Sequence, residues 1–210
     1  MIDWKDLLKI AIGIIQEASL TSEDWTFGGG TALAFYFNHR KSKDVDIFLS
    51  NPQFLTRLSP RLNEKAEEIS KDYIEQSNFI KLKLNGQEID FIVAPNLTGL
   101  KPEQVYIQEY RVNIDKPQEI IAKKIYYRPE SLKIRDIIDI AEVYKNYPDV
   151  IEILQKNRLI PNREVIYKRL DYLKKQPVET ILKQLSLEKD IDFDKSLKLF
   201  EKFIKNLYKG

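Results

Sequence analysis

Two aspartates separated by a single residue stand inside an apolar run. In the sequence DVDIFL, Asp44 and Asp46 flank Val45. Because side chains alternate across a strand, both carboxylates are predicted to lie on one face. Two carboxylates this close repel each other unless a positive charge lies between them, and oxygen-only ligands favour Mg²⁺ or Mn²⁺. The pattern predicts a divalent-cation site, although a solvated strand end with Asp44 paired to Lys43 or Lys41 explains the same residues.

A third acidic residue, Asp90, lies in the later apolar run EIDFIV. If its strand neighbours the strand at 44–49, three carboxylates converge. Such a set suits two metal ions about 3.5–4 Å apart that assist phosphoryl transfer. Glu88 is predicted on the same face of its strand and is the alternative third ligand. An ordinary half-exposed strand aspartate is the structural alternative for Asp90.

Three glycines at 28–30 separate a predicted strand at 25–27 from a predicted helix at 31–37. A glycine turn at a helix N-terminus presents bare backbone N–H groups, which can bind the phosphates of a nucleoside triphosphate (NTP). The Thr31 hydroxyl can add to them. A tight turn that needs positive φ accounts for the same glycines without a ligand. The order of glycine turn, short helix and Asp-x-Asp strand favours the phosphate interpretation and is typical of polymerase-beta-type nucleotidyltransferases.

The run GGGTALAFYFNHRKSKDVDIFL resembles the signature of the nucleotidyltransferase toxins of the AbiEii/AbiGii abortive-infection family. That family carries GGTALAL, then HR, then S-x-D-[LIV]-D-[FI] in the same order. Metal binding alone does not require the HR pair, so the match is specific, although a cation near a helix C-terminus is also ordinary capping. The matching residues are Gly29, Gly30, Thr31, Ala32, Leu33, His39, Arg40, Ser42, Asp44, Asp46 and Ile47.

The resemblance continues into two later segments. The family has a helix with the pattern I-A-x-K-[LI], then an arginine, and then a helix with the pattern [RK]-D-x-x-D-[IL]. The matching residues here are Ile121, Ala122, Lys124, Ile125, Arg128, Arg135, Asp136, Asp139 and Ile140. The resemblance implies that Lys124 contacts the triphosphate. Asp136 and Asp139 share a helix face and are expected to orient Lys124 or an arginine, or to touch the nucleotide base. Two alternatives exist for Lys124: it is an ordinary solvated helix lysine, or the adjacent Lys123 has the proposed role. The alternative for the aspartates is an Arg135–Asp139 ion pair within the helix.

Periodicity divides the chain into an α/β half, 1–115, and an all-helical half, 116–210. Asn85-Gly86 between two alternating runs predicts a type I′ hairpin. In the first half, the predicted elements are helices over 3–18, 31–37 and 53–70 and strands over 25–27, 44–49, 79–84 and 87–93. In the second half, helices are predicted over 117–128, over 132–146 with Ser131 as the cap, and in the remainder to Gly210.

Composition limits the classes of protein that the chain can be. Of its 210 residues, 43% are hydrophobic and 31% charged, which is typical of a globular protein. It has no cysteine and one histidine, His39, which excludes disulfides and most catalytic zinc sites. No apolar run reaches the roughly 18 residues of a membrane helix, and the charged N-terminus is not a signal peptide. We therefore expect no membrane association and a cytoplasmic location.

Taken together, the resemblance implies an α+β protein: a polymerase-beta-like nucleotidyltransferase domain with a small mixed sheet, followed by a C-terminal helical domain. The implied site comprises Asp44, Asp46 and Asp90 as metal ligands, and Gly29, Gly30, Thr31, Arg40, Lys124, Asp136 and Asp139 around the NTP.

The implied reaction moves a nucleoside monophosphate from an NTP to an acceptor. The resemblance suggests an RNA acceptor such as tRNA, a separate antitoxin protein, and a role in toxin–antitoxin or phage-defence systems. The net charge of +2 neither supports nor excludes RNA. Two alternatives remain: a small-molecule nucleotidyltransferase of the antibiotic-modifying type, and a non-catalytic nucleotide-binding protein on this fold.

Overall fold

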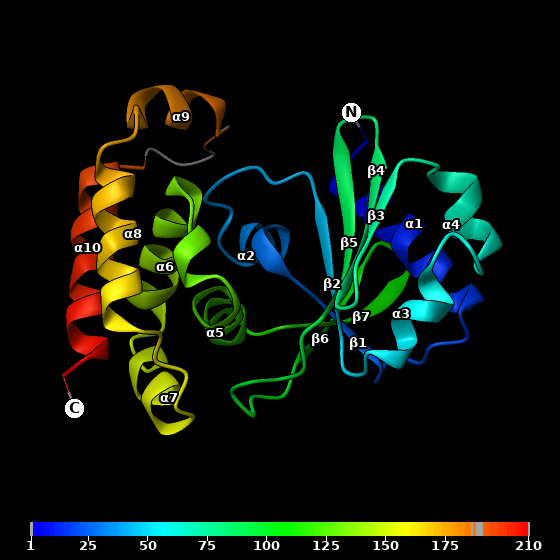
Figure 1. Cartoon of the computed structure of the whole chain (residues 1–210), viewed down its shortest axis with the longest axis horizontal. Helices are drawn as coiled ribbons and strands as arrows, with labels where there is room; N and C mark the ends of the chain where they lie inside the picture. The colour runs from blue at the N-terminus through cyan, green and yellow to red at the C-terminus, as the bar shows by residue number, and fades with distance from the viewer. Residues whose placement is uncertain (1, 186, 188–190, 210) are drawn as a thin grey trace. The chain divides into compact units, whose positions relative to one another are not determined.

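The computed structural model describes residues 2–185, 187 and 191–209, and Figure 1 traces its helices and strands. The chain divides into two compact units. The first comprises Met1–Ala32, Ser42–Asn96 and Lys101–Lys116. The second comprises Leu33–Lys41, Leu97–Leu100 and Pro117–Gly210. The short segments at 33–41 and 97–100 therefore belong with the C-terminal helices rather than with the residues that flank them.

A mixed sheet forms the first unit. In the described residues it has seven strands in the order β3-β4-β5-β2-β1-β7-β6. The strands are β1 (Trp25–Gly28), β2 (Val45–Leu49), β3 (Tyr73–Glu75), β4 (Phe79–Leu84), β5 (Gln87–Val93), β6 (Glu103–Ile107) and β7 (Tyr110–Ile114). The prediction of an α+β fold with a small mixed sheet is confirmed. The β6–β7 hairpin was not predicted.

Strand β2 occupies the centre of the sheet, antiparallel to β1 and parallel to β5. Alternation gives it one apolar face and one face that carries Asp46. The apolar face is fully buried and is formed with β5 by Val45, Ile47, Leu49, Ile89 and Phe91. Helix α1 (Trp4–Glu17) contacts β2 and β5, and Trp4 stacks on Phe27 of β1 with ring centroids 5.8 Å apart.

The single helix predicted over 53–70 is wrong. The structure has two helices, α3 (Gln53–Leu58) and α4 (Glu64–Ile69). Ser59 is extended, with ψ 133°, because the proline that follows disfavours the helical conformation of the residue before it. The helix restarts at Asn63, whose side chain accepts a hydrogen bond from the Ala66 N–H at 2.9 Å. This is an ordinary N-cap.

The hairpin predicted at Asn85-Gly86 is confirmed. Both residues have positive φ, 48° and 79°, as a type I′ turn requires. Leu84 pairs with Gln87, and from there the two-residue turn fixes the register along β4 and β5. That register places Lys81 opposite Asp90.

The second unit is helical. Its helices are α5 (Pro117–Tyr127), α6 (Ile134–Asn146), α7 (Val150–Lys156), α8 (Arg163–Lys174), α9 (Val178–Gln184) and α10 (Phe193–Leu207), together with the end of α2 (Gly29–Phe37) and a 3₁₀ turn, η1 (Pro129–Ser131). Helix α10 packs against α6 and α7, with Tyr144 edge-on to Phe203 at 5.6 Å. Residues 186, 188–190 and 210, also predicted as part of the helical tail, lie outside the described residues.

Ser131 does not cap α6, so that prediction is wrong. Ser131 lies in the 3₁₀ turn, and the helix starts after Lys133. The Lys133 N–H donates to Asp136 Oδ2 at 2.8 Å, so an acidic residue within the first turn provides the cap. No helix in the described ranges is long and apolar enough to cross a membrane.

Candidate active site

The two strand aspartates at the centre of the sheet are direct neighbours. The register of the parallel pair β2–β5 places Asp46 opposite Asp90, one residue along from the buried Val45–Ile89 pair. Both aspartates are only partly buried. In this register the residue beside Asp46 is Asp90, while Glu88 contacts Asp44.

The Asp90 carboxyl is in an unfavourable environment for a negative charge. Burial, followed by the charge of Asp46, raises its pKa to about 6, while Lys81 acts in the opposite direction. Asp90 Oδ2 accepts a hydrogen bond from Lys81 Nζ at 2.8 Å. Its Oδ1 is buried and has no hydrogen-bond partner in the described residues. A buried carboxylate oxygen without a partner, next to a second carboxylate, is suited to a bound cation.

Asp44 and Glu88 flank this pair of aspartates. Asp44 precedes β2, and its Oδ1 accepts a hydrogen bond from the Glu88 N–H at 3.1 Å. The Glu88 carboxylate forms an ion pair with Lys81. One carboxylate oxygen of Asp44 therefore already accepts a hydrogen bond. The described residues contain no group of three or more His, Cys, Asp or Glu side chains arranged to hold a metal ion. The fit to a metal rests on Asp46 and on the unpartnered oxygen of Asp90.

Lys81 is a site residue that the sequence analysis did not identify. It bridges Glu88 and Asp90, and these contacts raise its pKa although burial opposes them. Its side chain is 22% exposed, so Lys81 remains a charged group at the edge of the acidic site. Counting back from the Asn85-Gly86 turn gives this pairing from sequence alone.

The backbone of the glycine turn lies against the Asp46 side chain. Gly29 has φ +68°, and a Cβ built there would lie 1.9 Å from Asp46 Oδ2. Both facts require glycine, because an L-residue is disfavoured at positive φ and has no room here. Gly28 pairs with Asp46 across β1 and β2, and a Cβ there would meet Phe48 at 2.3 Å. The glycine turn is therefore fitted directly against a predicted metal ligand.

Gly29→Ala is expected to reduce catalysis far more than stability. The strained φ costs roughly 1–2 kcal/mol, while the new methyl group displaces the Asp46 carboxylate. The matched control is Gly86→Ala, which carries similar strain at φ +79° but meets no atom within 4 Å. Thermal unfolding should show similar losses for the two variants, and a nucleotide-transfer assay should show a large loss only for Gly29→Ala. Equal activity in the two variants would contradict a role for this contact.

Thr31 follows the turn and is 1% exposed. Its hydroxyl lies 2.8 Å from Ser42 Oγ and also bonds the Asp44 carbonyl oxygen. The Thr31 side chain thus connects the first turn of α2 to the segment that enters β2. Gly30, in the same turn, is partly exposed. Hydroxyl contacts between Thr31 and a ligand stay a prediction.

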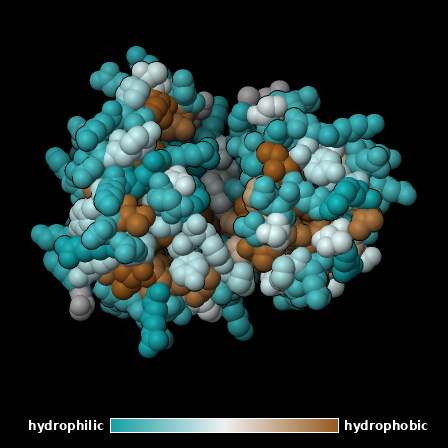
Figure 2. Space-filling model, viewed as in Figure 1, coloured by the Kyte–Doolittle hydropathy of each residue, from teal (hydrophilic) through white to brown (hydrophobic). Residues whose placement is uncertain are grey.

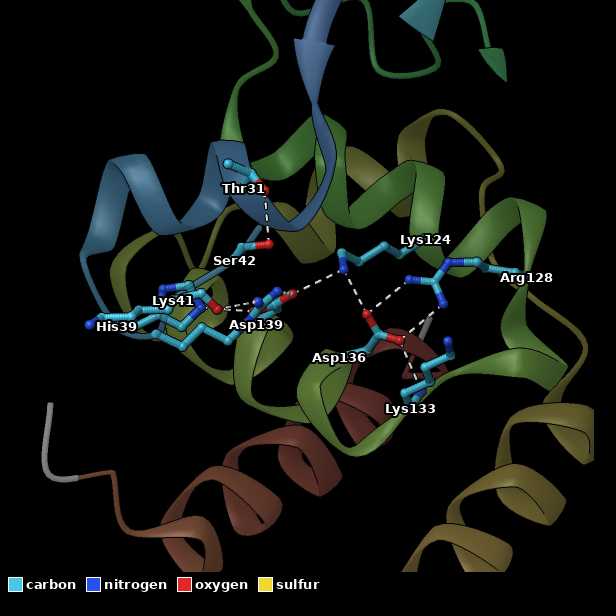
Figure 3. A network of polar contacts seen from close by, with 10 residues as sticks. Thr31, His39, Lys41, Ser42, Lys124, Arg128, Lys133, Asp136 and Asp139 are labelled. Atoms are coloured by element: carbon cyan, nitrogen blue, oxygen red, sulfur yellow. Dashed lines mark hydrogen bonds and ion pairs between the residues drawn. The ribbon is translucent and has the colours of Figure 1, made fainter. Parts of the chain in front are cut away.

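The second unit contains a buried ion-pair network (Figure 3). At its centre Asp139, 0% exposed, accepts from Arg40 Nε at 2.8 Å and Nη2 at 2.9 Å. His39 Nε2 lies 2.8 Å from the same carboxylate, and Lys124 Nζ lies 3.0 Å from its Oδ2. The His39-Arg40 pair of the sequence signature therefore binds Asp139. The alternative of an Arg135–Asp139 helix pair is not formed.

Asp136 completes this network from the first turn of α6. It accepts from Lys124 Nζ at 2.6 Å and from both terminal nitrogens of Arg128 at 2.9 and 3.0 Å. Lys124 is thus held between two aspartates, and its side chain is 8% exposed. The adjacent Lys123 is also buried and pairs with Glu119 at 3.4 Å. Lys124 is not a solvated helix lysine.

The electrostatics of this network favour ionised aspartates. Burial alone raises the pKa of Asp139, but Arg40 and Lys124 outweigh it and hold that pKa well below its ordinary value. For Asp136, burial likewise raises the pKa, while Lys124 and Arg128 lower it to a net value below the ordinary range. Glu119, whose carboxylate caps the N–H groups of Leu97 and Thr98 at 3.0 and 2.9 Å, anchors the segment at 97–100 to α5.

Solved structures with a similar fold include nucleotidyltransferases. MenT4, a nucleotidyltransferase toxin from Mycobacterium tuberculosis, matches with a TM-score of 0.61 and 13% identity over 99% of this chain and 83% of that one. The antibiotic-resistance factor ANT(2″)-Ia matches with a TM-score of 0.54 and 15% identity over 73% and 90%. JHP933 from Helicobacter pylori matches with a TM-score of 0.51 and 16% identity over 96% and 90%. The fold is that of the nucleotidyltransferases.

A family model identifies the family within the nucleotidyltransferases. The model described as the nucleotidyl transferase AbiEii toxin of type IV toxin–antitoxin systems matches residues 14–209. The chain belongs to this AbiEii family and is a nucleotidyltransferase. The match extends well beyond the stretch from Gly29 to Ile140 that carries the sequence motifs. No curated protein sequence matches the chain.

Proposed function

We propose that this protein transfers a nucleoside monophosphate from an NTP to an acceptor, with release of pyrophosphate. The observation that carries the proposal is the contact set around Asp46: Asp90 lies opposite it in the sheet, and the backbone of Gly29 leaves no room for a Cβ above it. Asp44, Asp46 and Asp90 are the proposed ligands of Mg²⁺ or Mn²⁺. A bound divalent ion supplies charge stabilisation for the phosphoryl group in transfer.

The chain's own groups have distinct proposed roles. The backbone N–H groups of Gly29 and Gly30, at the start of α2, bind the β- and γ-phosphates, with the Thr31 hydroxyl beside them. Asp90 is also the proposed acceptor of the proton that the attacking hydroxyl group loses.

Lys124 is the proposed cation for the triphosphate, with Asp136 and Asp139 to orient it and Arg40, which binds Asp139, as a further residue of the nucleotide site. In this proposal an incoming phosphate competes with the two aspartates for Lys124 Nζ. The aspartates keep the ammonium in one position, so little side-chain entropy is lost on binding. Lysine is suited to this role as a compact point charge.

Lys124→Ala is expected to impair NTP use much more than Lys123→Ala. A charge-assisted phosphate contact contributes about 1.5–3 kcal/mol, or roughly tenfold to more than a hundredfold in kcat/KM. The two lysines are matched in helix, burial and possession of an acidic partner. Steady-state kinetics with varied NTP, normalised to folded protein, measures the difference. Equal kinetics for the two variants would remove Lys124 from the proposal.

The proposed acceptor is RNA, for instance tRNA, and the proposed setting is a cytoplasmic toxin controlled by a separate antitoxin in phage defence. Membership of the AbiEii toxin family supports this setting. The second candidate is a small-molecule acceptor. It is favoured by the fold likeness to ANT(2″)-Ia, an antibiotic-resistance factor whose solved structures include a complex with adenylyl-2″-tobramycin.

One experiment distinguishes the RNA acceptor from the small-molecule acceptor. The protein is incubated with each labelled NTP in turn, Mg²⁺, and either total RNA or tobramycin. Products are resolved by denaturing gel and by thin-layer chromatography. We expect label on an RNA species with one NTP preferred. Label on tobramycin alone would favour the small-molecule acceptor, and no label with any NTP would contradict the catalytic proposal.

A further inference from the structure

A cavity of about 300 Å³ lies within the helical unit, bounded by the start of α6, the second half of α8, and α9 with the residue that follows it. This is near the lower end of the size range of small-ligand sites, roughly 300–1,000 Å³. It is lined by Lys133, Ile134, Arg135, Arg169, Tyr172, Leu173, Gln176, Ile181 and Leu185. None of these residues belongs to the proposed active site.

The charged residues of this cavity are all cationic. Lys133, Arg135 and Arg169 contribute to the lining, and none of the described lining residues is acidic. Arg135 is half-buried and forms no hydrogen bond or ion pair in the described part of the chain. For a chain with a net charge of only +2, this is a local concentration of positive charge. It fits an anionic ligand.

The Arg169–Tyr172 pair is built as a stacking platform. Arg169 Nε donates to the Leu132 carbonyl oxygen at 2.6 Å, which fixes the guanidinium, and its central carbon lies 4.6 Å from the centroid of the Tyr172 ring. Tyr172 is nevertheless 52% exposed. Exposed aromatic rings and arginine planes are the surfaces on which proteins stack unpaired bases.

The rest of the lining is apolar and comes from Ile134, Leu173, Ile181 and Leu185. An apolar wall, an exposed aromatic ring and several cations suit a ligand that has both a flat ring and a negative charge. Figure 2 shows hydrophilic side chains over much of the face viewed, with apolar groups scattered among them, which is ordinary for a protein surface. What distinguishes this cavity is that it combines cations, an exposed aromatic ring and an apolar wall.

We propose that this cavity binds one unpaired nucleotide of the RNA acceptor, with the base against Tyr172 and the apolar wall and the phosphate at Arg135 and Arg169. The inference rests on the proposed RNA acceptor and adds the part of the chain that recognises it. A base alone does not explain the cations, and a free inorganic anion does not explain the aromatic and apolar lining.

The test measures binding of bulk tRNA and of a short single-stranded RNA to the full chain by fluorescence anisotropy over a range of salt concentrations. Arg135→Gln is expected to weaken binding about tenfold and to reduce the salt slope by about one. Tyr172→Ala is expected to weaken binding roughly fivefold to a hundredfold through loss of stacking.

Arg163→Gln is the matched control. Arg163 also lies on α8 and over tyrosine rings, 5.6 Å from the centroid of Tyr167 and 5.7 Å from that of Tyr208, but it does not line the cavity. Its RNA affinity should remain within about twofold of the wild type. A loss equal to that of Arg135→Gln would mean general electrostatics rather than this cavity, and would overturn the inference.

RNA labelling by the same variants separates this inference from the proposed function. If the wild type labels RNA and both cavity variants keep its KM for RNA, the cavity assignment is wrong and the function stands. If the wild type neither binds nor labels RNA, the RNA acceptor fails and the inference fails with it.

Discussion

Asp46→Asn is expected to remove nearly all nucleotide transfer, by roughly a thousandfold or more. The substitution keeps the shape of the side chain but removes the charge that faces Asp90 across β2 and β5. Stabilisation of the transferring phosphoryl group by metal ions contributes several kcal/mol, and about 1.4 kcal/mol corresponds to a factor of ten in rate. Transfer of label from NTP at saturating Mg²⁺ measures the loss.

The folded state should not suffer from this change. Asp46 raises the pKa of Asp90 by repulsion, so neutralising it leaves the free protein as stable as before or slightly more stable. The control is Asp72→Asn, which removes an exposed carboxylate that pairs with Lys83 in the same unit and should leave transfer unchanged. Substantial transfer by well-folded Asp46→Asn protein would exclude the proposed metal site.

The same variant tests the biological setting. Expression of the wild type is expected to slow or stop bacterial growth, and Asp46→Asn at matched soluble levels should relieve the arrest. Arrest that depends on catalysis follows the metal ligands and not the amount of folded protein. Equal arrest by both proteins would favour a nucleotide- or partner-binding protein without catalysis. Absence of arrest in several hosts would favour a small-molecule acceptor.

Asp139→Asn is expected to lower the free energy of unfolding by about 3–5 kcal/mol, because removal of one partner from a buried network leaves the others uncompensated. Here the uncompensated groups are Arg40 and Lys124, both buried. Chemical denaturation measures the loss. The control Glu201→Gln breaks the half-exposed pair with Lys174 in the same unit and should change stability by less than about 1 kcal/mol.

The effect of Asp139→Asn should also depend on pH in a defined direction. The pKa of Asp139 is held well below its ordinary value in the folded protein. A lowered folded-state pKa gives stability that is fully present above the unfolded-state value, about 3.9, and is lost as the pH falls below it. The stability difference between wild type and variant should therefore be constant near neutral pH and shrink below about pH 4. A difference that grows on acidification would contradict this assignment.

The central part of the fold follows from short-range signals in the sequence. Alternation put Asp46 on the face of β2 opposite Val45 and Ile47, and Asn85-Gly86 gave the β4–β5 hairpin, both as the structure has them. Asp44 was predicted within the same strand, but it lies just before β2. The β6–β7 hairpin was missed for a physical reason. Its outer strand is largely exposed, with Tyr106 at 74%, so it lacks the alternation of buried and exposed residues by which strands are recognised.

The acidic site was predictable in part. The neighbouring strands at 44–49 and 87–93 were a conditional expectation, and the structure makes them adjacent. Lys81 was accessible by counting the hairpin register but carries no motif of its own. The partners of Asp139 lie about a hundred residues away in sequence, and ion pairs of that span depend on tertiary packing that no local pattern encodes.

The cavity of the helical unit could not be predicted from the sequence, for a different reason. Its cations come from the start of α6 and from α8. Arg135 lies in a stretch that resembles a family motif, but in the sequence Lys133 and Arg169 are each one basic residue among many. The packing of the helices is what brings Arg135 and Arg169 to one cavity. A cavity of this kind has no sequence signature comparable to a glycine turn or an Asp-x-Asp strand.

The path of the chain bears on how this protein can be divided or recombined. Because 33–41 and 97–100 belong to the helical unit, a fragment beginning at Pro117 would carry Asp139 without Arg40 and Glu119 without the backbone groups that it caps. The two units are therefore not interchangeable modules. Chimaeras joined at Lys116 with other family members would exchange incomplete halves, and grafting of the helical unit must include those two short segments.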